Sequence, residues 1–267
     1  VGNDIKGFDL TSTSIRALCV DREHNLWVGC NKKGLLFMPS RKAKFTTWNF
    51  SQQNTNIGGS VTSVCKGENG ITWCAVQNNG VYGFDRDGKI CAHPKAPAGT
   101  NIIYRDRQGR FWIGADNGLF SYNPYSGEFK YEMKIDGESV NAIADDGNGK
   151  LFVSDFGKGM KIFDSKSGSV STYNMFMNDP KHGHLNNNWI MTLYYDRQGM
   201  LWIGNTAGLM MFAPKTNTFF PTYGGSFLEY STCNSFYEMA DGNMMIGTIA
   251  GLYLFDRKRN EARPYQG

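Results

Sequence analysis

The chain lacks the features that mark membrane-spanning, helical or metal-dependent proteins. No apolar run approaches the roughly 20 residues that a helix needs to cross a bilayer. No signal peptide is visible at Val1, so an exported protein would be present here in mature or trimmed form. No stretch of helical length is amphipathic. The six cysteines form no CxxC pair and no zinc spacing, so we expect buried free thiols and no metal.

Motifs for catalysis and nucleic-acid binding are also missing. There is no nucleophile elbow, P-loop or HExxH motif, and we predict neither a catalytic residue nor a cofactor. His182 and His184 have no third ligand nearby in the sequence, which favours solvated loop histidines. The net charge is only +4, and its clusters, Arg41-Lys42-Lys44 and Arg257-Lys258-Arg259, fall at expected turns. We interpret them as solvated turns and expect no nucleic-acid partner for this region.

What the sequence does contain is an internal repeat. The segment DRQGRFWIG at 106–114 returns as DRQGMLWIG at 196–204, and weaker copies begin at Asp21, Asp146 and Asp241. Each copy places a large apolar residue in one position, at intervals of about 40 to 50 residues: Trp27, Trp73, Trp112, Phe152, Trp202 and Met245. The units span approximately 12–50, 59–96, 99–135, 138–176, 186–223 and 230–265. We interpret residues 1–267 as a single domain of tandem units.

Each unit is predicted to be a four-stranded antiparallel meander. In the third unit, residues 101–106, 111–114, 119–122 and 128–133 are short apolar runs separated by turns rich in glycine, asparagine and proline. The middle strands, such as 201–204, are almost entirely apolar, which is typical of strands covered on both faces.

A small sheet with two apolar faces needs a like sheet on each side, which a radial array supplies. The sequence therefore predicts an all-β fold, a β-propeller of about six four-stranded antiparallel blades. The large aromatic of each unit would fill the space between blades, and the glycine after it would allow close approach of backbones. The units either close into a six-bladed ring or form part of a seven-bladed or longer array.

The pattern D-x-x-G-x-[LF]-W-[IV]-G followed by G-L resembles the two-component regulator propeller repeat. Units three and five match best, whereas unit one has His24-Asn25 at the turn and unit two has Gly67 in place of the aspartate. The resemblance implies the periplasmic sensor region of a hybrid histidine kinase from Bacteroidetes-type bacteria. Such regions are non-catalytic, typically detect an oligosaccharide and control polysaccharide-utilisation genes. The resemblance further implies a homodimer anchored in the membrane through segments not present here.

Binding residues are expected on one face of the propeller. On that face the connections between blades meet the turns between second and third strands. The DRQG turns are expected on the opposite face, where they have a structural role only. Aromatic rings can stack on a sugar, and amides can pair with its hydroxyls. The candidate ligand-binding residues are Trp48, Asn49, Gln52, Asn78, Asp116, Lys158, His184, Asn187, Trp189 and Asn205. The alternative for each asparagine is that it only forms a turn.

Two other functions stay open at this point. A propeller glycoside hydrolase or lyase needs two carboxylates facing each other across the channel. Those near first strands are Glu68, Glu138, Asp145, Asp146, Glu229 and Glu238. A protein-interaction scaffold would instead use the exposed surface of the propeller.

Overall fold

Within the described residues, twenty-four strands form six four-stranded antiparallel sheets, each made of strands consecutive in the chain. The structure, a computed structural model, describes residues 13–32, 34–38, 46–48, 59–177, 179–221 and 231–265. Blades 1 and 2 contain β1 Ile15–Val20, β2 Leu26–Cys30, β3 Gly34–Met38, β4 Thr46–Trp48, β5 Val61–Lys66, β6 Thr72–Val76, β7 Gly80–Phe84 and β8 Ile90–Ala92. Blades 3 and 4 contain β9 Ile102–Arg105, β10 Phe111–Ala115, β11 Gly118–Asn123, β12 Glu128–Met133, β13 Ile143–Asp145, β14 Lys150–Asp155, β15 Gly159–Asp164 and β16 Val170–Tyr173. Blades 5 and 6 contain β17 Ile190–Tyr195, β18 Leu201–Asn205, β19 Gly208–Ala213, β20 Thr218–Pro221, β21 Cys233–Glu238, β22 Met244–Thr248, β23 Gly251–Asp256 and β24 Glu261–Pro264.

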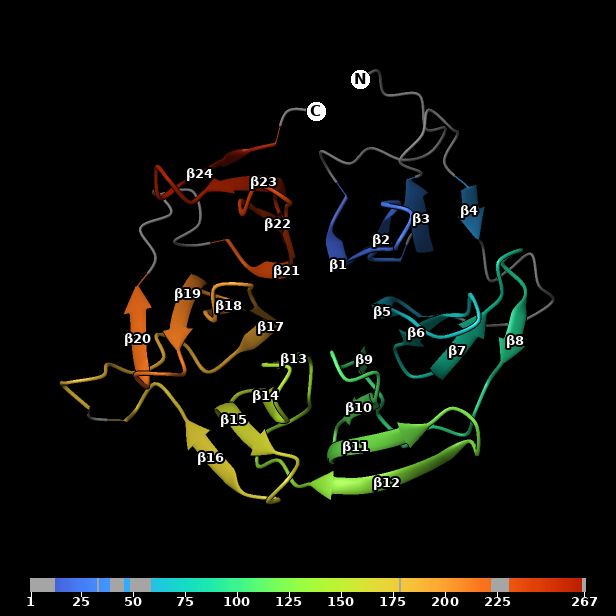
Figure 1. The fold of residues 1–267 in the computed structure, drawn as a ribbon, viewed down its shortest axis with the longest axis horizontal. Coiled ribbons are helices and arrows are strands. Elements are labelled where there is room, and N and C mark those ends of the chain that lie inside the picture. The colour runs from blue at the N-terminus through green and yellow to red at the C-terminus, as the bar shows by residue number, and fades with distance from the viewer. Residues whose placement is uncertain are drawn as a thin grey trace.

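The six sheets stand around a common centre as the blades of a propeller (Figure 1). The first strand of each blade faces the centre and the fourth lies at the rim. Because β21 of the last blade contacts β1 of the first, the ring is closed with six blades. This confirms the all-β propeller predicted from the repeat. None of the described residues forms a helix long and apolar enough to cross a membrane.

The repeated aromatic fills the space between neighbouring blades, as predicted. Trp112 and Trp202 are 3% and 1% exposed, respectively. The Trp202 ring packs edge-on against Phe236 and Phe255 of blade 6, with centroids 6.2 and 5.2 Å away. Burying a large aromatic in this way removes 150 to 250 Å² from water. The repeat therefore supplies one such side chain to the interface that it makes with the next blade.

The glycine that follows in the motif is required by close approach. A Cβ on Gly204 would lie 2.5 Å from Thr192 Cγ2 and 2.8 Å from Cys233 Cβ. Thr192 belongs to the same blade and Cys233 to the innermost strand of the next. Any side chain at this position would push the two blades apart.

A buried aspartate links the first turn of the blade to the aromatic. Asp196 accepts hydrogen bonds from the Trp202 indole N–H at 2.7 Å and from the backbone N–H groups of Gln198 and Met200, both at 2.9 Å. The same indole bond joins Asp106 to Trp112 at 2.9 Å. The motif D-x-x-G-x-x-W thus encodes a turn and the orientation of its tryptophan together.

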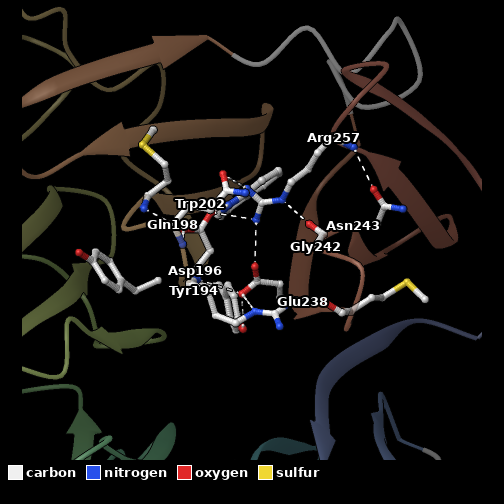
Figure 2. A network of polar contacts seen from close by, with 12 residues as sticks. Tyr194, Asp196, Gln198, Trp202, Glu238, Gly242, Asn243 and Arg257 are labelled. Atoms are coloured by element: carbon white, nitrogen blue, oxygen red, sulfur yellow. Dashed lines mark hydrogen bonds and ion pairs between the residues drawn. The ribbon is translucent and has the colours of Figure 1, made fainter.

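Arg257 connects this aspartate to the next blade (Figure 2). Its guanidinium lies 2.9 Å from the Asp196 carboxylate and 3.5 Å from that of Glu238, and 5.0 Å above the Trp202 ring. Its side chain is only 16% exposed. The cluster 257–259 does form the turn between outer strands, but the expectation that Arg257 is solvated was wrong. Two carboxylates and an aromatic face draw the guanidinium into the groove between blades 5 and 6.

A tyrosine and a carboxylate connect inner strands of neighbouring blades in two places. The Tyr104 hydroxyl donates to Asp145 at 2.6 Å, and the Tyr194 hydroxyl donates to Glu238 at 3.4 Å. Burial, followed by the charge of Glu238, raises the pKa of Tyr194 to about 12. The phenol therefore stays a donor across the physiological range, which preserves the link between blades.

All six cysteines are free, as predicted, but the expectation that they are all buried was wrong for Cys91, which lies on the short outer strand β8. Cys30, Cys65, Cys74 and Cys233 are buried, Cys19 is intermediate and Cys91 is exposed. Burial, and then the charge of Asp21, raise the pKa of Cys19 to about 11.

We expect Asp196→Ala to lower the free energy of unfolding by about 3 to 5 kcal/mol, because it leaves Arg257 and the Trp202 indole N–H without their buried acceptor. Urea denaturation monitored by tryptophan fluorescence measures this loss. The matched control, Asp241→Ala in an exposed turn, should change stability by about 0.5 kcal/mol. Equal effects of the two substitutions would contradict the role assigned to Asp196.

We expect the native protein at pH 8 to show one rapidly reacting thiol with a chromogenic disulfide reagent, and all six in denaturant without reductant. The rapid thiol is Cys91, so Cys91→Ser should abolish the rapid phase. Cys19 should react faster as the pH rises toward its pKa of about 11, because the thiolate is the nucleophile. Fewer than six reactive thiols in denaturant would reveal a disulfide.

Candidate functional site

The two faces of the propeller divide its loops as predicted. On one face the connections between blades meet the turns between second and third strands. Asn205 Nδ2 donates to Asn186 Oδ1 at 2.8 Å, and Asn101 Nδ2 donates to Asp116 Oδ1 at 2.9 Å. We call this the connection face. The DRQG turns lie with the turns between third and fourth strands on the opposite face, where Arg257 N donates to Asn243 Oδ1 at 3.1 Å.

The connection from blade 4 to blade 5, residues 174–189 without Asn178, is held firmly on the connection face. Leu185 is fully buried in the core between the two blades. Asn188 is 3% exposed, and its side-chain oxygen accepts from Met175 N at 2.8 Å while its carbonyl accepts from Gly157 N at 3.2 Å. Asp179 accepts from the His182 ring at 2.8 Å, and Phe219 N donates to His182 O at 2.7 Å. The long connection is therefore an ordered structure with its own hydrogen bonds.

This connection presents aromatic rings to solvent. Trp189 is 44% exposed and Phe176 is 79% exposed. The backbone of Trp189 is fixed on both sides, since its N–H donates to Asn187 Oδ1 at 2.7 Å and its carbonyl accepts from Thr206 N at 3.2 Å. Thr206 Oγ1 also donates to Asn187 Oδ1 at 3.3 Å. An indole on a fixed backbone can stack on a ligand without the entropy cost of ordering the loop that carries it.

Charged groups of blade 4 lie on the same face. Asp155 is fully buried and accepts from the backbone N–H groups of Asp136 and Gly137 at 3.1 and 2.6 Å. The ammonium of Lys161 lies 2.6 Å from Asp136 and 3.6 Å from Asp155. The Lys161 hydrogen bond, then its charge, lower the pKa of Asp136. Lys158, in the turn after β14, is exposed and adds a positive charge beside this cluster.

The structure brings together part of the predicted set. Asn187, Trp189, Asn205 and the turn that carries Lys158 meet where blades 4 and 5 adjoin. Asn205, however, is fully buried and bonded to Asn186, so it holds the connection in place.

The remaining members of the set lie elsewhere. Asn78 and Asp116 are exposed on the turns of blades 2 and 3. His184 is exposed, and its ring bonds the Leu185 carbonyl. Asn49 and Gln52 lie outside the described residues, as does the side chain of Trp48.

Sequence reasoning did not single out Phe176 or Asn188. The first is the other exposed ring of the same connection, so its residue type and position were a usable signal. The second is a buried hydrogen-bonding hub in a run of three asparagines, and no pattern in that run distinguishes it from its neighbours.

The carboxylates considered for an enzyme are largely engaged in structural contacts on the other face. Glu68 lies 3.0 Å from Arg105, Asp145 accepts from Tyr104, and Glu238 accepts from Tyr194 and the backbone of Arg197. Glu138 and Asp146 are on exposed or partly exposed turns, and Glu229 lies outside the described residues. Within the described residues, no three His, Cys, Asp or Glu side chains come together as a metal site.

Two segments of the chain, residues 9–32 and 184–207, match the family model described as two component regulator propeller. They fall in units one and five. The match to unit five agrees with the repeat pattern, whereas unit one matches despite its missing turn glycine. No curated protein matches the chain in sequence.

Solved structures share the fold at low sequence identity. The extracellular domain of a hybrid two component system from B. thetaiotaomicron is similar over 95% of this chain and 35% of its own length, with 18% identity and a TM-score of 0.69. The extracellular domain of a one component system from the same organism is similar over 94% of this chain and 41% of its own length, with 17% identity and a TM-score of 0.57. Virginiamycin B lyase from Staphylococcus aureus is similar over 97% of this chain and 86% of its own, with 13% identity and a TM-score of 0.70.

The chain thus spans about a third to two-fifths of the two extracellular domains. At sequence identities this low, structural similarity establishes only the fold. The lyase has the same fold as the two extracellular domains. The repeat itself is more specific, because a family model recognises it in two units. Two segments of the chain thus match the two component regulator propeller model, and the described residues form a closed six-bladed β-propeller.

Proposed function

We propose that this chain is a non-catalytic ligand-sensing propeller of a hybrid two-component sensor histidine kinase. In this proposal the propeller lies on the periplasmic side of the inner membrane and is anchored through other parts of the protein. It works as a homodimer and controls polysaccharide-utilisation genes. The repeat family and the extracellular location of two structural neighbours support this proposal.

We further propose that the ligand is an oligosaccharide bound on the connection face. The observation that carries this step is the exposed Trp189 indole, on a backbone that hydrogen bonds to Asn187 and Thr206 fix where blades 4 and 5 meet. A sugar ring can cover the indole while its hydroxyls pair with amides and hydroxyl groups alongside. The exposed ammonium of Lys158 favours an acidic sugar over a neutral one.

We expect Trp189→Ala to weaken oligosaccharide binding at least about tenfold, a loss of about 1.4 kcal/mol, because the stacking surface is removed. Calorimetric titration with neutral and acidic oligosaccharides, on this chain and on the intact extracytoplasmic region, measures the affinity. Phe220→Ala is the matched control, since Phe220 is a 40% exposed aromatic on the outer strand β20. The Phe220→Ala variant should bind oligosaccharide with the same affinity as the unsubstituted protein.

Two results would oppose the proposal. If no oligosaccharide binds the intact region, the sensing role for glycans fails. If Trp189→Ala binds as tightly as Phe220→Ala, the ligand lies elsewhere on the propeller.

A further inference from the structure

The groove between blades 5 and 6 has an internal counterpart between blades 1 and 2. In the first groove, Arg257 follows Asp256 at the end of β23 and lies beside Gly242 (Figure 2). Strand register gives the corresponding positions in blade 2. In blade 6, Met244 of the second strand pairs with Glu238 on one side and Phe255 on the other. In blade 2, Thr72 of the second strand pairs with Lys66 on one side and Phe84 on the other.

This register makes Arg86 the counterpart of Arg257 and Lys66 the counterpart of Glu238. Both arginines lie beside the turn glycine of their own blade: a Cβ on Gly70 would lie 2.4 Å from Arg86 Nε, and Arg257 Nε donates to the Gly242 carbonyl. On the blade 1 side, Asp21 corresponds to Asp196, and it accepts from the Trp27 indole N–H at 3.1 Å. The aspartate, the tryptophan and the arginine are therefore kept, while the second carboxylate is replaced by an ammonium.

The replacement changes what the groove can do. Arg257 closes its groove by pairing with Glu238, but Lys66 offers Arg86 a like charge instead of a partner. Among the described residues, Arg86 has no ion pair, and Lys66 has only one, to the exposed Glu23 at 3.7 Å. Where the first groove is filled by a side chain, the second is a cavity of about 790 Å³ lined by both Lys66 and Arg86. That volume is within the range of small-molecule sites.

The cavity wall also carries five carboxylates, those of Asp21, Glu23, Glu68, Asp85 and Asp87, and three of them have hydrogen-bond or ion-pair partners other than Lys66 and Arg86. Asp21 is occupied by Trp27 and Asn25, Glu68 by Arg105, and Asp85 by backbone N–H groups of its own turn. Glu23 and Asp87 also line the cavity, as does Arg22.

An aromatic surface completes the wall. The Trp27 and Phe37 rings lie with centroids 4.5 Å apart, and both line the cavity. A flat ring is the shape that such a surface covers best.

We propose that the groove between blades 1 and 2 binds a small organic anion with a ring-shaped body. Its carboxylate lies between Arg86 and Lys66 and supplies Arg86 with the negative charge that Glu238 gives Arg257 in the other groove, and its ring lies against Trp27 and Phe37. The site is on the face of the DRQG turns, opposite the connection face, so it is a second ligand site distinct from the one proposed for the oligosaccharide.

The test is calorimetric titration of the whole chain with benzoate and with glucuronate, each beside an uncharged analogue, benzyl alcohol and glucose. We expect at least one of the carboxylates to bind and its uncharged analogue to bind at least about tenfold more weakly. Lys66→Glu restores the arrangement of the other groove and lets Arg86 close the cavity, so it should weaken carboxylate binding more than about tenfold. Lys166→Glu, the same change on an exposed turn of blade 4, should leave it unchanged.

Arg86→Ala is a second variant, at an exposed position, and should also weaken binding. Each variant is checked by circular dichroism, and oligosaccharide binding on the connection face should be the same in all of them. The proposal is overturned if neither carboxylate binds, if the uncharged analogues bind equally well, or if Lys66→Glu and Lys166→Glu have the same affinity. Loss of oligosaccharide binding with carboxylate binding intact would bear on the proposed function alone.

Discussion

The best-matching blades depend on an aspartate at the end of the innermost strand, which is buried in blades 3 and 5 and partly exposed in blade 1. In blades 1, 3 and 5 this aspartate accepts an indole N–H, so a single side chain fixes both the first turn and the ring that fills the space between blades. A carboxylate without partners would be costly to bury, and the backbone N–H groups of the turn offset that cost. Because turn, ring and interface share one acceptor, a sequence that keeps D-x-x-G-x-x-W keeps the geometry of the whole blade.

The fold was predictable because the residues that define each turn and strand are close together in the sequence of every repeat unit. Turn residues, apolar strands and one large apolar side chain per unit predicted the blade, and two apolar faces per sheet required the ring. The role of Arg257 was not predictable in this way. Its turn position follows from the local sequence, but the direction of its side chain depends on Asp196 and Glu238, which are far away in the chain.

The candidate site was predictable only in outline, for a similar reason. The faces of the propeller follow from strand order, so the sequence assigned each loop to its face. Within a loop, however, the exposure of a side chain depends on tertiary contacts. Asn187 and Asn205 are the same residue type on neighbouring loops, yet one is half-buried beside Trp189 and the other is fully buried as a support. Residue type alone does not separate a ligand contact from a loop support.

In the described part of the chain, every blade is a contiguous segment, since no sheet borrows a strand from another unit. The seam between β1 and β21 is therefore of the same kind as the other inter-blade contacts, with no shared hydrogen-bond ladder across it. In evolutionary terms, one blade is a transferable cassette. An in-frame duplication or deletion of a single unit changes the circumference of the ring while leaving every backbone ladder intact, so gene rearrangement can vary blade number without inventing a new fold.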